Sequence, residues 1–141
     1  MKVRLKTVKF YEITDDDKLL IETALEAIRG CFDGRYHVVG AALRLKSGQV
    51  FKGVNCDGIH GSCAEFIAIG AAVTNGLRDF DTIVAVHKEA PGFVVPPCGN
   101  CRQMLFEYCP DIKVILNDEQ GNTVKTGISD LLPLAYVEPG K

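Results

Sequence analysis

The chain has 141 residues, of which 47% are hydrophobic and 24% charged, a composition typical of one globular domain. Sixteen Lys and Arg against 18 Asp and Glu give a net charge of -2, so no basic excess can neutralise a nucleic acid or an anionic membrane surface. The longest apolar run, residues 66–73, is far shorter than the ~20 residues of a membrane span. No signal peptide is visible at the start, so we expect a cytoplasmic protein whose six cysteines are free, catalytic or metal-bound.

Helices and strands alternate along most of the chain. We expect residues 1–12 to form an N-terminal arm and residues 13–141 to form a single domain. The first helix begins at Thr14, a suitable N-cap that is followed by three acids favoured by the helix dipole, and it ends near Gly30. Periodicity and turn residues predict the remaining elements: strands over 36–45 and 50–55, a helix over 63–74, a strand over 81–87, a loop over 89–97, a helix over 98–109, strands over 112–116 and 123–126, and a short helix from Ser129.

This order of elements predicts the fold class. Strands that alternate with helices after an opening hairpin favour a three-layer α/β/α domain around a mixed sheet of five strands.

Two segments carry residues with obvious chemistry, and each begins a predicted helix: Cys63-Ala64-Glu65 and Pro97-Cys98-Gly99-Asn100-Cys101. A helix N-terminus stabilises a thiolate. Cys98 and Cys101 share one helix face and can grip a single ion, to which Cys63 can add a third sulfur. Three protein ligands leave the fourth position of a tetrahedral zinc to water, which is the arrangement of a catalytic site.

Glu65 follows Cys63 by two residues, which places its carboxylate beside such a metal rather than on it. There it can move a proton from water to a leaving group. Three thiolates outnumber the two charges of zinc, and Arg102 together with the helix N-termini can offset the excess. A non-ligating Glu combined with Pro-Cys-x-x-Cys is the signature described for zinc deaminases of nucleobases.

On these segments the chain resembles the cytidine deaminase family, and within it the enzymes that act on blasticidin S. The resemblance runs from about His37 to Tyr136. It implies Zn²⁺ on Cys63, Cys98 and Cys101, and it implies Glu65 as the proton shuttle. It also implies a homotetramer that acts on a small cytosine nucleoside, and the charge balance above argues against a nucleic-acid or membrane partner.

The resemblance also implies substrate contacts. The backbone of Ala64 would contact the pyrimidine ring, and Asn55 and Asp57 would contact the sugar. Tyr136 and the tail over 134–141 would form part of the active-site wall of a neighbouring subunit. His37 stands where these enzymes usually place a Phe against the base.

Four departures from the family pattern concern mainly the substrate. Asp57 replaces a Glu, His37 replaces the Phe, Phe66 replaces an Arg, and the loop from Asn55 to Cys63 is short. A modified nucleoside such as blasticidin S fits these departures at least as well as cytidine does.

Simpler interpretations stand beside each of these. The three cysteines could lie in the core, form a redox pair, or hold a closed structural zinc with His60 or Cys56 as fourth ligand. Glu65 could only be an acid that interacts favourably with the N-terminus of the helix dipole. Arg102 could be a surface residue, and Asp57 could be an acidic loop residue without a role. The other cysteines, Cys31, Cys56 and Cys109, are predicted to be buried without a role.

Three functions therefore compete. The first is hydrolytic deamination of a cytosine nucleoside, with release of ammonia. The second is a non-catalytic, zinc-stabilised module that binds a nucleoside or a protein. The third is a polynucleotide deaminase, which the net charge disfavours because a single strand needs an electropositive channel.

Overall fold

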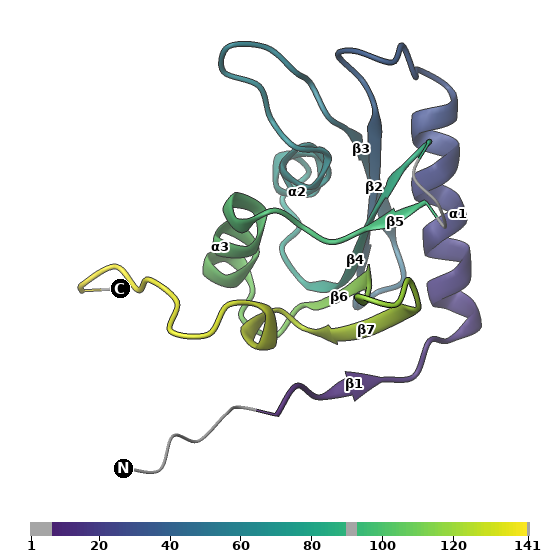
Figure 1. Cartoon of the computed structure of the whole chain (residues 1–141). Coiled ribbons are helices and arrows are strands. Elements are labelled where there is room, and N and C mark those ends of the chain that lie inside the picture. The colour runs from purple at the N-terminus through teal and green to yellow at the C-terminus, as the bar shows by residue number, and fades with distance from the viewer. Residues whose placement is uncertain (1–6, 90–92, 141) are drawn as a thin grey trace.

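The structure is a computed structural model and describes residues 7–89 and 93–140. Helix α1 (Asp15–Arg29) covers one face of a central sheet, and helices α2 (Ala64–Thr74) and α3 (Gly99–Tyr108) cover the other (Figure 1). A 3-10 helix, η1 (Ile128–Leu131), follows the last strand close to the short helix that was predicted. The predicted α/β/α architecture is confirmed. No helix in the described part of the chain has the length and apolarity that crossing a bilayer requires.

The sheet is mixed, as predicted. Its spatial order is β1-β7-β6-β4-β2-β3, with β5 paired to β4 beside this row. β4 and β6 run parallel, and the other described pairs are antiparallel. The bounds are β1 (Phe10–Tyr11), β2 (Val39–Leu45), β3 (Val50–Val54), β4 (Phe80–His87), β5 (Val94–Val95), β6 (Lys113–Asn117) and β7 (Thr123–Gly127).

Within residues 7–89 and 93–140 the sheet has seven strands rather than the predicted five. The two additional strands, β1 and β5, contain two residues each, which is too short for alternation to reveal. β1 pairs with β7, and the hydroxyl of Thr126 donates to the carbonyl of Lys9 at 2.7 Å. The inner end of the predicted arm therefore lies on the sheet edge, while residues 1–6 lie outside the described part. The division into an arm and a domain stays a prediction.

Side chains alternate between the two faces of the sheet and build two cores. Ala42 and Val84 pack with Leu20 and Ile28 of α1 on one face. Ala41, Leu43 and Ile83 belong to the second core, which α2 and α3 cover. This period of two fixes which strand residues can face the site.

The predicted start of α1 is confirmed, and it is more elaborate than a simple cap. Thr14 and Asp17 form a reciprocal capping box. Asp17 is fully buried and also accepts from Lys125 of β7 at 2.6 Å and from Arg44 of β2 at 2.9 Å. Burial acts to raise the pKa of the Asp17 carboxyl, but the hydrogen bonds from Lys125, Thr14 and Arg44 outweigh it and lower the pKa to about 2.

Strand β2 begins at Val39, three residues later than the predicted start at residue 36. The Asp33 carboxylate accepts from the backbone N–H groups of residues 35–37, which form a tight loop. The side-chain oxygen of Asn55 accepts from the N–H groups of Val38 and Val39 at 2.7 and 2.8 Å. Side chains thus take the donors that a longer strand would use for its ladder.

Gly53 of β3 lets α2 approach the sheet. A Cβ atom at this position would lie 2.5 Å from the backbone nitrogen of Ala68 and 2.6 Å from the carbonyl oxygen of Ala64. Only glycine permits this contact, so Gly53 sets the position of the first turn of α2, which begins beside Cys63.

Candidate active site

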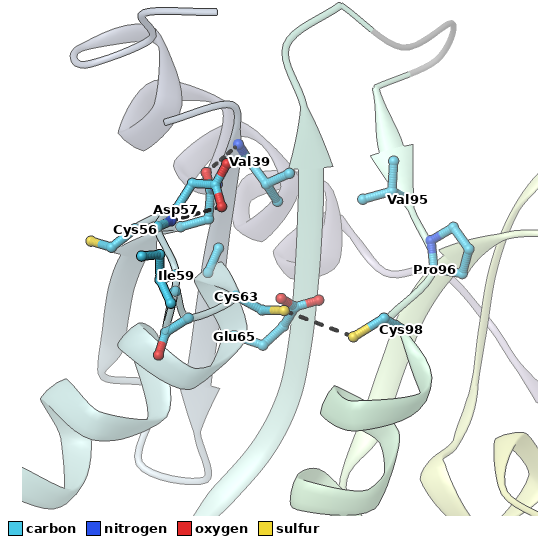
Figure 2. A pocket seen from close by; sticks show the side chains of 14 residues that line it. Val39, Cys56, Asp57, Ile59, Cys63, Glu65, Val95, Pro96 and Cys98 are labelled. Atoms are coloured by element: carbon cyan, nitrogen blue, oxygen red, sulfur yellow. Dashed lines mark hydrogen bonds between the residues drawn. The ribbon is translucent and has the colours of Figure 1, made fainter. Parts of the chain in front are cut away.

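Three cysteine sulfurs meet at the N-termini of α2 and α3. Cys63 and Cys98 are the N-cap residues of these helices, which begin one position later than predicted, and Cys101 lies in the first turn of α3. The three sulfurs all lie within 4.8 Å of one another, and the Cys63 and Cys98 sulfurs are 3.8 Å apart (Figure 2). The backbone N–H of Cys101 points to the Cys98 sulfur at 3.5 Å.

The electrostatics of this cluster favour a bound cation. Burial raises the pKa of the Cys101 thiol, and Glu65, Cys63 and Cys98 raise it further. Burial also raises the pKa of the Cys63 thiol, where a hydrogen bond with Cys101 acts in the opposite direction without outweighing it. For Cys98, burial also acts to raise the pKa, but the N–H of Cys101 and neighbouring thiols outweigh it and lower the pKa. Three acidic groups with no internal counterion are costly to ionise together unless a metal compensates them.

The donor set fits zinc. Sulfur ligands suit Zn²⁺, and sulfurs at ~2.3 Å from one tetrahedral zinc lie ~3.8 Å apart, the distance seen between Cys63 and Cys98. Within the described residues, neither His60 nor Cys56 joins the cluster as a fourth ligand. The arrangement therefore matches an open, three-ligand zinc site rather than a closed structural one.

Glu65 lies at the second position of α2, and only 6% of its surface is exposed. Burial raises the pKa of its carboxyl, although hydrogen bonds to its own backbone and to Cys101 act in the opposite direction. The carboxyl therefore takes up a proton more readily than an exposed glutamate does. That property suits a group that must both accept and donate a proton.

A pocket of about 440 Å³ opens above the cysteines, within the size range of small-molecule sites. Val95 and Pro96 form one side, and Asp57 and Ile59 lie on the opposite side, with Cys63, Glu65 and Cys98 between them (Figure 2). The wall residues Val95, Pro96 and Ile59 were not predicted. For Val95 and Pro96 the only sequence signal is that they precede Pro97-Cys98.

Asn55, Asp57 and Ala64 all line this pocket. The side chain of Asn55 makes most of its hydrogen bonds to backbone groups. Its oxygen accepts twice, from residues 38 and 39, and its nitrogen donates to the carbonyl of Tyr36 at 3.2 Å. One amide hydrogen is left for a ligand. Asp57 is exposed, and its Oδ1 accepts from the N–H of Gly58 at 2.8 Å.

The structure places His37 and Tyr136 outside this pocket. The His37 ring lies 2.8 Å from the carbonyl oxygen of Asn55 and lines a neighbouring cavity together with Cys31 and Lys52. Tyr136 lines a third cavity, beside Tyr108 at the end of α3. Within one chain, neither side chain reaches the cysteine cluster.

Arg102 lies behind the cysteines and contacts backbone rather than sulfur. Its guanidinium donates to the carbonyls of Pro97 at 2.8 Å and Leu131 at 3.1 Å. These hydrogen bonds connect the segment before Cys98 to η1, so Arg102 helps to fix the position of the cysteines.

The prediction that the remaining cysteines are buried is wrong for two of them. Cys31 and Cys56 are exposed, whereas Cys109 is half-buried against the core. Cys31 follows the end of α1, and Cys56 begins the loop after β3 with its sulfur directed away from the pocket (Figure 2). Both lie on connecting segments at the surface, where packing does not bury a thiol.

Comparisons with known proteins agree with this geometry. Residues 14–117 match the family model of the cytidine and deoxycytidylate deaminase zinc-binding region. A blasticidin-S deaminase of Bacillus cereus is 41% identical over 138 residues, covering 92% of this chain and 98% of that protein. A cytidine deaminase of Halalkalibacterium halodurans is 40% identical over 128 residues, covering 86% of this chain and 94% of that protein.

Solved structures show the same fold. The cytidine deaminase of Burkholderia pseudomallei superposes with a TM-score of 0.70 at 34% identity, covering 84% of this chain and 98% of that one. The cytidine deaminase of Mycobacterium tuberculosis gives a TM-score of 0.72 at 26% identity, covering 89% and 100%. The three-cysteine cluster, the matched family model and these relatives lead to one conclusion: the chain belongs to the cytidine deaminase family of zinc-dependent hydrolases.

Proposed function

We propose that this protein hydrolyses the 4-amino group of a free cytosine nucleoside to a 4-oxo group and releases ammonia, with blasticidin S as the first candidate substrate and cytidine as the second. The observation that carries the proposal is the buried Glu65 carboxyl beside three clustered cysteines at the floor of an open pocket. The relative named blasticidin-S deaminase, 41% identical over nearly the whole chain, supports the order of the two substrates.

The proposed roles divide between Cys63, Cys98 and Cys101, which would hold the metal, and Glu65, which would move protons. Bound there, zinc would lower the pKa of a water molecule and so supply a nucleophile at neutral pH. Glu65 takes the proton that this water loses and delivers it to ring nitrogen N3 as the C4–O bond forms. It then takes the proton of the hydroxyl group formed on C4 and carries it to the departing amine as the C4–N bond breaks, so that ammonia leaves and the carbonyl remains.

The remaining residues would orient the nucleoside. We assign the ring contact to the backbone of Ala64 and the sugar side to Asp57 and the one free amide hydrogen of Asn55. His37 supports this side indirectly, because its ring contacts the carbonyl of Asn55. Arg102 is assigned a positioning role through the carbonyl of Pro97.

We also propose that the protein is a homotetramer. Helix α2 is apolar on its inner side and also on its outer side. On the outer side, Ile67 and Val73 are each more than a third exposed. A helix that is apolar all round is normally covered. Tyr136, which is 63% exposed, would then contribute to the wall of a neighbouring subunit's site. Light scattering should give a mass of four chains, and a monomer at micromolar concentration would contradict this.

A cytoplasmic location completes the proposal. All six cysteines are free, and three of them must remain reduced to bind a metal. A reducing compartment keeps them in that state.

The test is ammonia release by the zinc-loaded protein from blasticidin S, cytidine and deoxycytidine, with Glu65→Gln as the matched variant. We expect release from blasticidin S or cytidine, and a loss of at least ~100-fold in Glu65→Gln at unchanged zinc content. Release from none of the three compounds, with tight binding of one of them, would instead support the non-catalytic binding module. A fully active, zinc-loaded Glu65→Gln protein would exclude Glu65 as the proton carrier.

A further inference from the structure

One wall of the active-site pocket is a short extended segment that leads directly into Cys98. This segment, residues 93–97, contains β5 and is called the strap below. Val95 and Pro96 of the strap line the pocket (Figure 2). Proline has no backbone N–H, so neither Pro96 nor Pro97 can donate a hydrogen bond that would hold it in place. The position of the wall therefore depends on how the two ends of the strap are anchored.

The strap enters the sheet where β4 and β6 separate. Residues 82–84 of β4 pair with β6, whereas residues 85–86 pair with β5. Because β2 pairs along the other edge of β4, β5 takes over the edge that β6 leaves. Open α/β sheets commonly bind ligands at the carboxyl ends of strands that separate in this way. The strap is thus held in the gap between two strands, directly beside the pocket.

Asn117, the last residue of β6, bridges this gap. Its side-chain nitrogen donates to the carbonyl of Val94 at 2.8 Å, and its side-chain oxygen accepts from the hydroxyl of Thr123 at 3.2 Å. The carbonyl of Phe93 accepts from the N–H of His87 in β4 at 2.7 Å. Successive carbonyls of a strand point to opposite edges, so the carbonyl of Val94 is directed away from β4. Asn117 therefore holds the strap on the side that β4 does not reach.

The position of Val94 determines the position of the pocket wall. The side chain of Val94 is buried in the core beneath α1, whereas Val95 packs against the core on the other face and lines the pocket. The two residues share one planar peptide unit, so a displacement of the first also moves the second. At the other end of the strap, Arg102 donates to the carbonyl of Pro97, beside the cysteines. The two anchors therefore act on different parts of the site: Arg102 on the cysteines, and Asn117 on the wall.

We infer that Asn117 is a positioning residue for substrate binding, which acts through the carbonyl of Val94 and fixes the wall formed by Val95 and Pro96. The inference rests on the proposed function and adds a residue that contacts neither the substrate nor the cysteines. An apolar wall contacts the bound nucleoside and the transition state alike. Its displacement should therefore raise KM and leave kcat unchanged.

The main variant is Asn117→Asp. It keeps the shape of the side chain and the acceptor for Thr123, but it replaces the donating NH₂ group with an oxygen that repels the carbonyl of Val94. The matched control is Asn122→Asp, which adds the same charge at an exposed amide on the turn after β6. The amide of Asn122 donates to Asp118, which lies outside the strap.

A second variant, Thr123→Val, removes only the hydroxyl that orients the amide of Asn117 and keeps the amide itself. For each protein, KM and kcat are measured with blasticidin S and with cytidine in the zinc-loaded state. The Kd of both compounds is measured by calorimetry in the Glu65→Gln background, where binding is separated from turnover. Zinc content and thermal melting are recorded alongside.

We expect Asn117→Asp to raise KM and Kd by about tenfold, the size of one lost hydrogen bond to a buried carbonyl. Its kcat should stay within about twofold of wild type, at unchanged zinc content. Thr123→Val should raise KM and Kd by about threefold, because the amide remains but is less well oriented. Asn122→Asp should match wild type in all of these properties.

A variant of Asn117 that melts earlier but keeps KM and Kd would show a purely structural role and would overturn the inference. A fall in kcat that follows a loss of zinc would overturn it as well. If Asn117→Asp does not fold, Thr123→Val decides, and an unchanged Kd in that variant contradicts the inference. Turnover of neither compound by the wild-type protein would overturn the deaminase function, whereas the Kd comparison would still decide the role of Asn117. Binding of neither compound would overturn both.

Discussion

Two polar clusters lie on opposite faces of the sheet, each at the first turn of a helix, and they differ in whether their charges are balanced. Under α1, Asp17 is bound by Lys125 and Arg44, and Arg44 also contacts Asp81 at 3.1 Å. At the starts of α2 and α3, three cysteines and Glu65 are all acidic groups, and no Lys, Arg or His lines their pocket among the described residues.

The difference separates a structural cluster from a functional one. The Asp17 cluster contains its own counterions, so its charges are balanced within the chain, and its ion pairs connect α1 to β2 and β7. The cysteine cluster lacks counterions, and its thiol pKa values are mostly raised by burial and by one another. Groups with perturbed pKa values that need an external cation indicate a functional site, whereas charged groups that neutralise one another indicate a structural role.

The largest expected effect comes from removing a member of the unbalanced cluster. Cys63→Ala should abolish stoichiometric zinc binding and lower deamination by more than ~100-fold, the upper loss typical of residues that only support metal ligands. Zinc content by mass spectrometry and ammonia release measure the two effects. Cys31→Ala, which changes an exposed cysteine outside the cluster, should leave both unaltered. A Cys63→Ala protein that keeps its zinc would contradict the assignment.

Breaking the balanced cluster should cost stability rather than chemistry. Asp17→Asn leaves the buried ammonium of Lys125 without its carboxylate, and we expect the free energy of unfolding to fall by about 3 kcal/mol. Activity per folded, zinc-loaded molecule should stay at the wild-type level. Urea unfolding with Asp16→Asn as control checks this, because Asp16 is exposed in the same turn and should cost about 0.5 kcal/mol. Equal losses in the two variants would show that burial of the pair is unimportant.

A substitution at Gly53 should affect the cysteine cluster indirectly, by displacing the start of α2. Gly53→Ala forces a Cβ into the backbone of α2, and we expect a loss of about 2 kcal/mol in stability together with weaker zinc binding. Gly30→Ala is the control, since its Cβ would meet nothing closer than 3.8 Å. Thermal melts and a competitive zinc titration would report the two properties. Unchanged zinc affinity in Gly53→Ala would mean that Cys63 adapts to a displaced helix.

The smallest effect is the pH dependence of the balanced cluster. The folded pKa of Asp17, about 2, lies below its ordinary value of 3.8, so its contribution is present above about pH 4 and is lost as the pH falls toward 2. The difference in unfolding free energy between wild type and Asp17→Asn should therefore be constant near neutral pH and shrink below pH 4. A difference that grows on acidification would have the wrong sign for a lowered carboxyl pKa.

The two clusters also differ in how far the sequence predicts them. The cysteine cluster is signalled locally, because Cys63-Ala64-Glu65 and Pro97-Cys98-x-x-Cys101 each contain ligands at a helix start and their types admit few other uses. The Asp17 cluster joins residues that lie 108 positions apart, and nothing near Lys125 indicates its partner. From the sequence, Asp17 is only an acid in the first turn of a helix.

The same limit explains the details that differ from prediction. The late start of β2 follows from side chains of Asp33 and Asn55 that take backbone donors, and β5 follows from pairing with β4 rather than from its own two residues. His37 lies behind Asn55 instead of in the pocket for the same reason. Long-range hydrogen bonds decide these positions, and hydrophobic periodicity does not record them.

The most direct test of the account is a stepwise zinc titration of the metal-free protein, with ammonia release measured at each step. The account predicts that activity rises in proportion to bound zinc and saturates at one zinc per chain, in line with the single three-cysteine cluster of the described residues. Activity that persists in the zinc-free protein, or that requires a second zinc per chain, would contradict it.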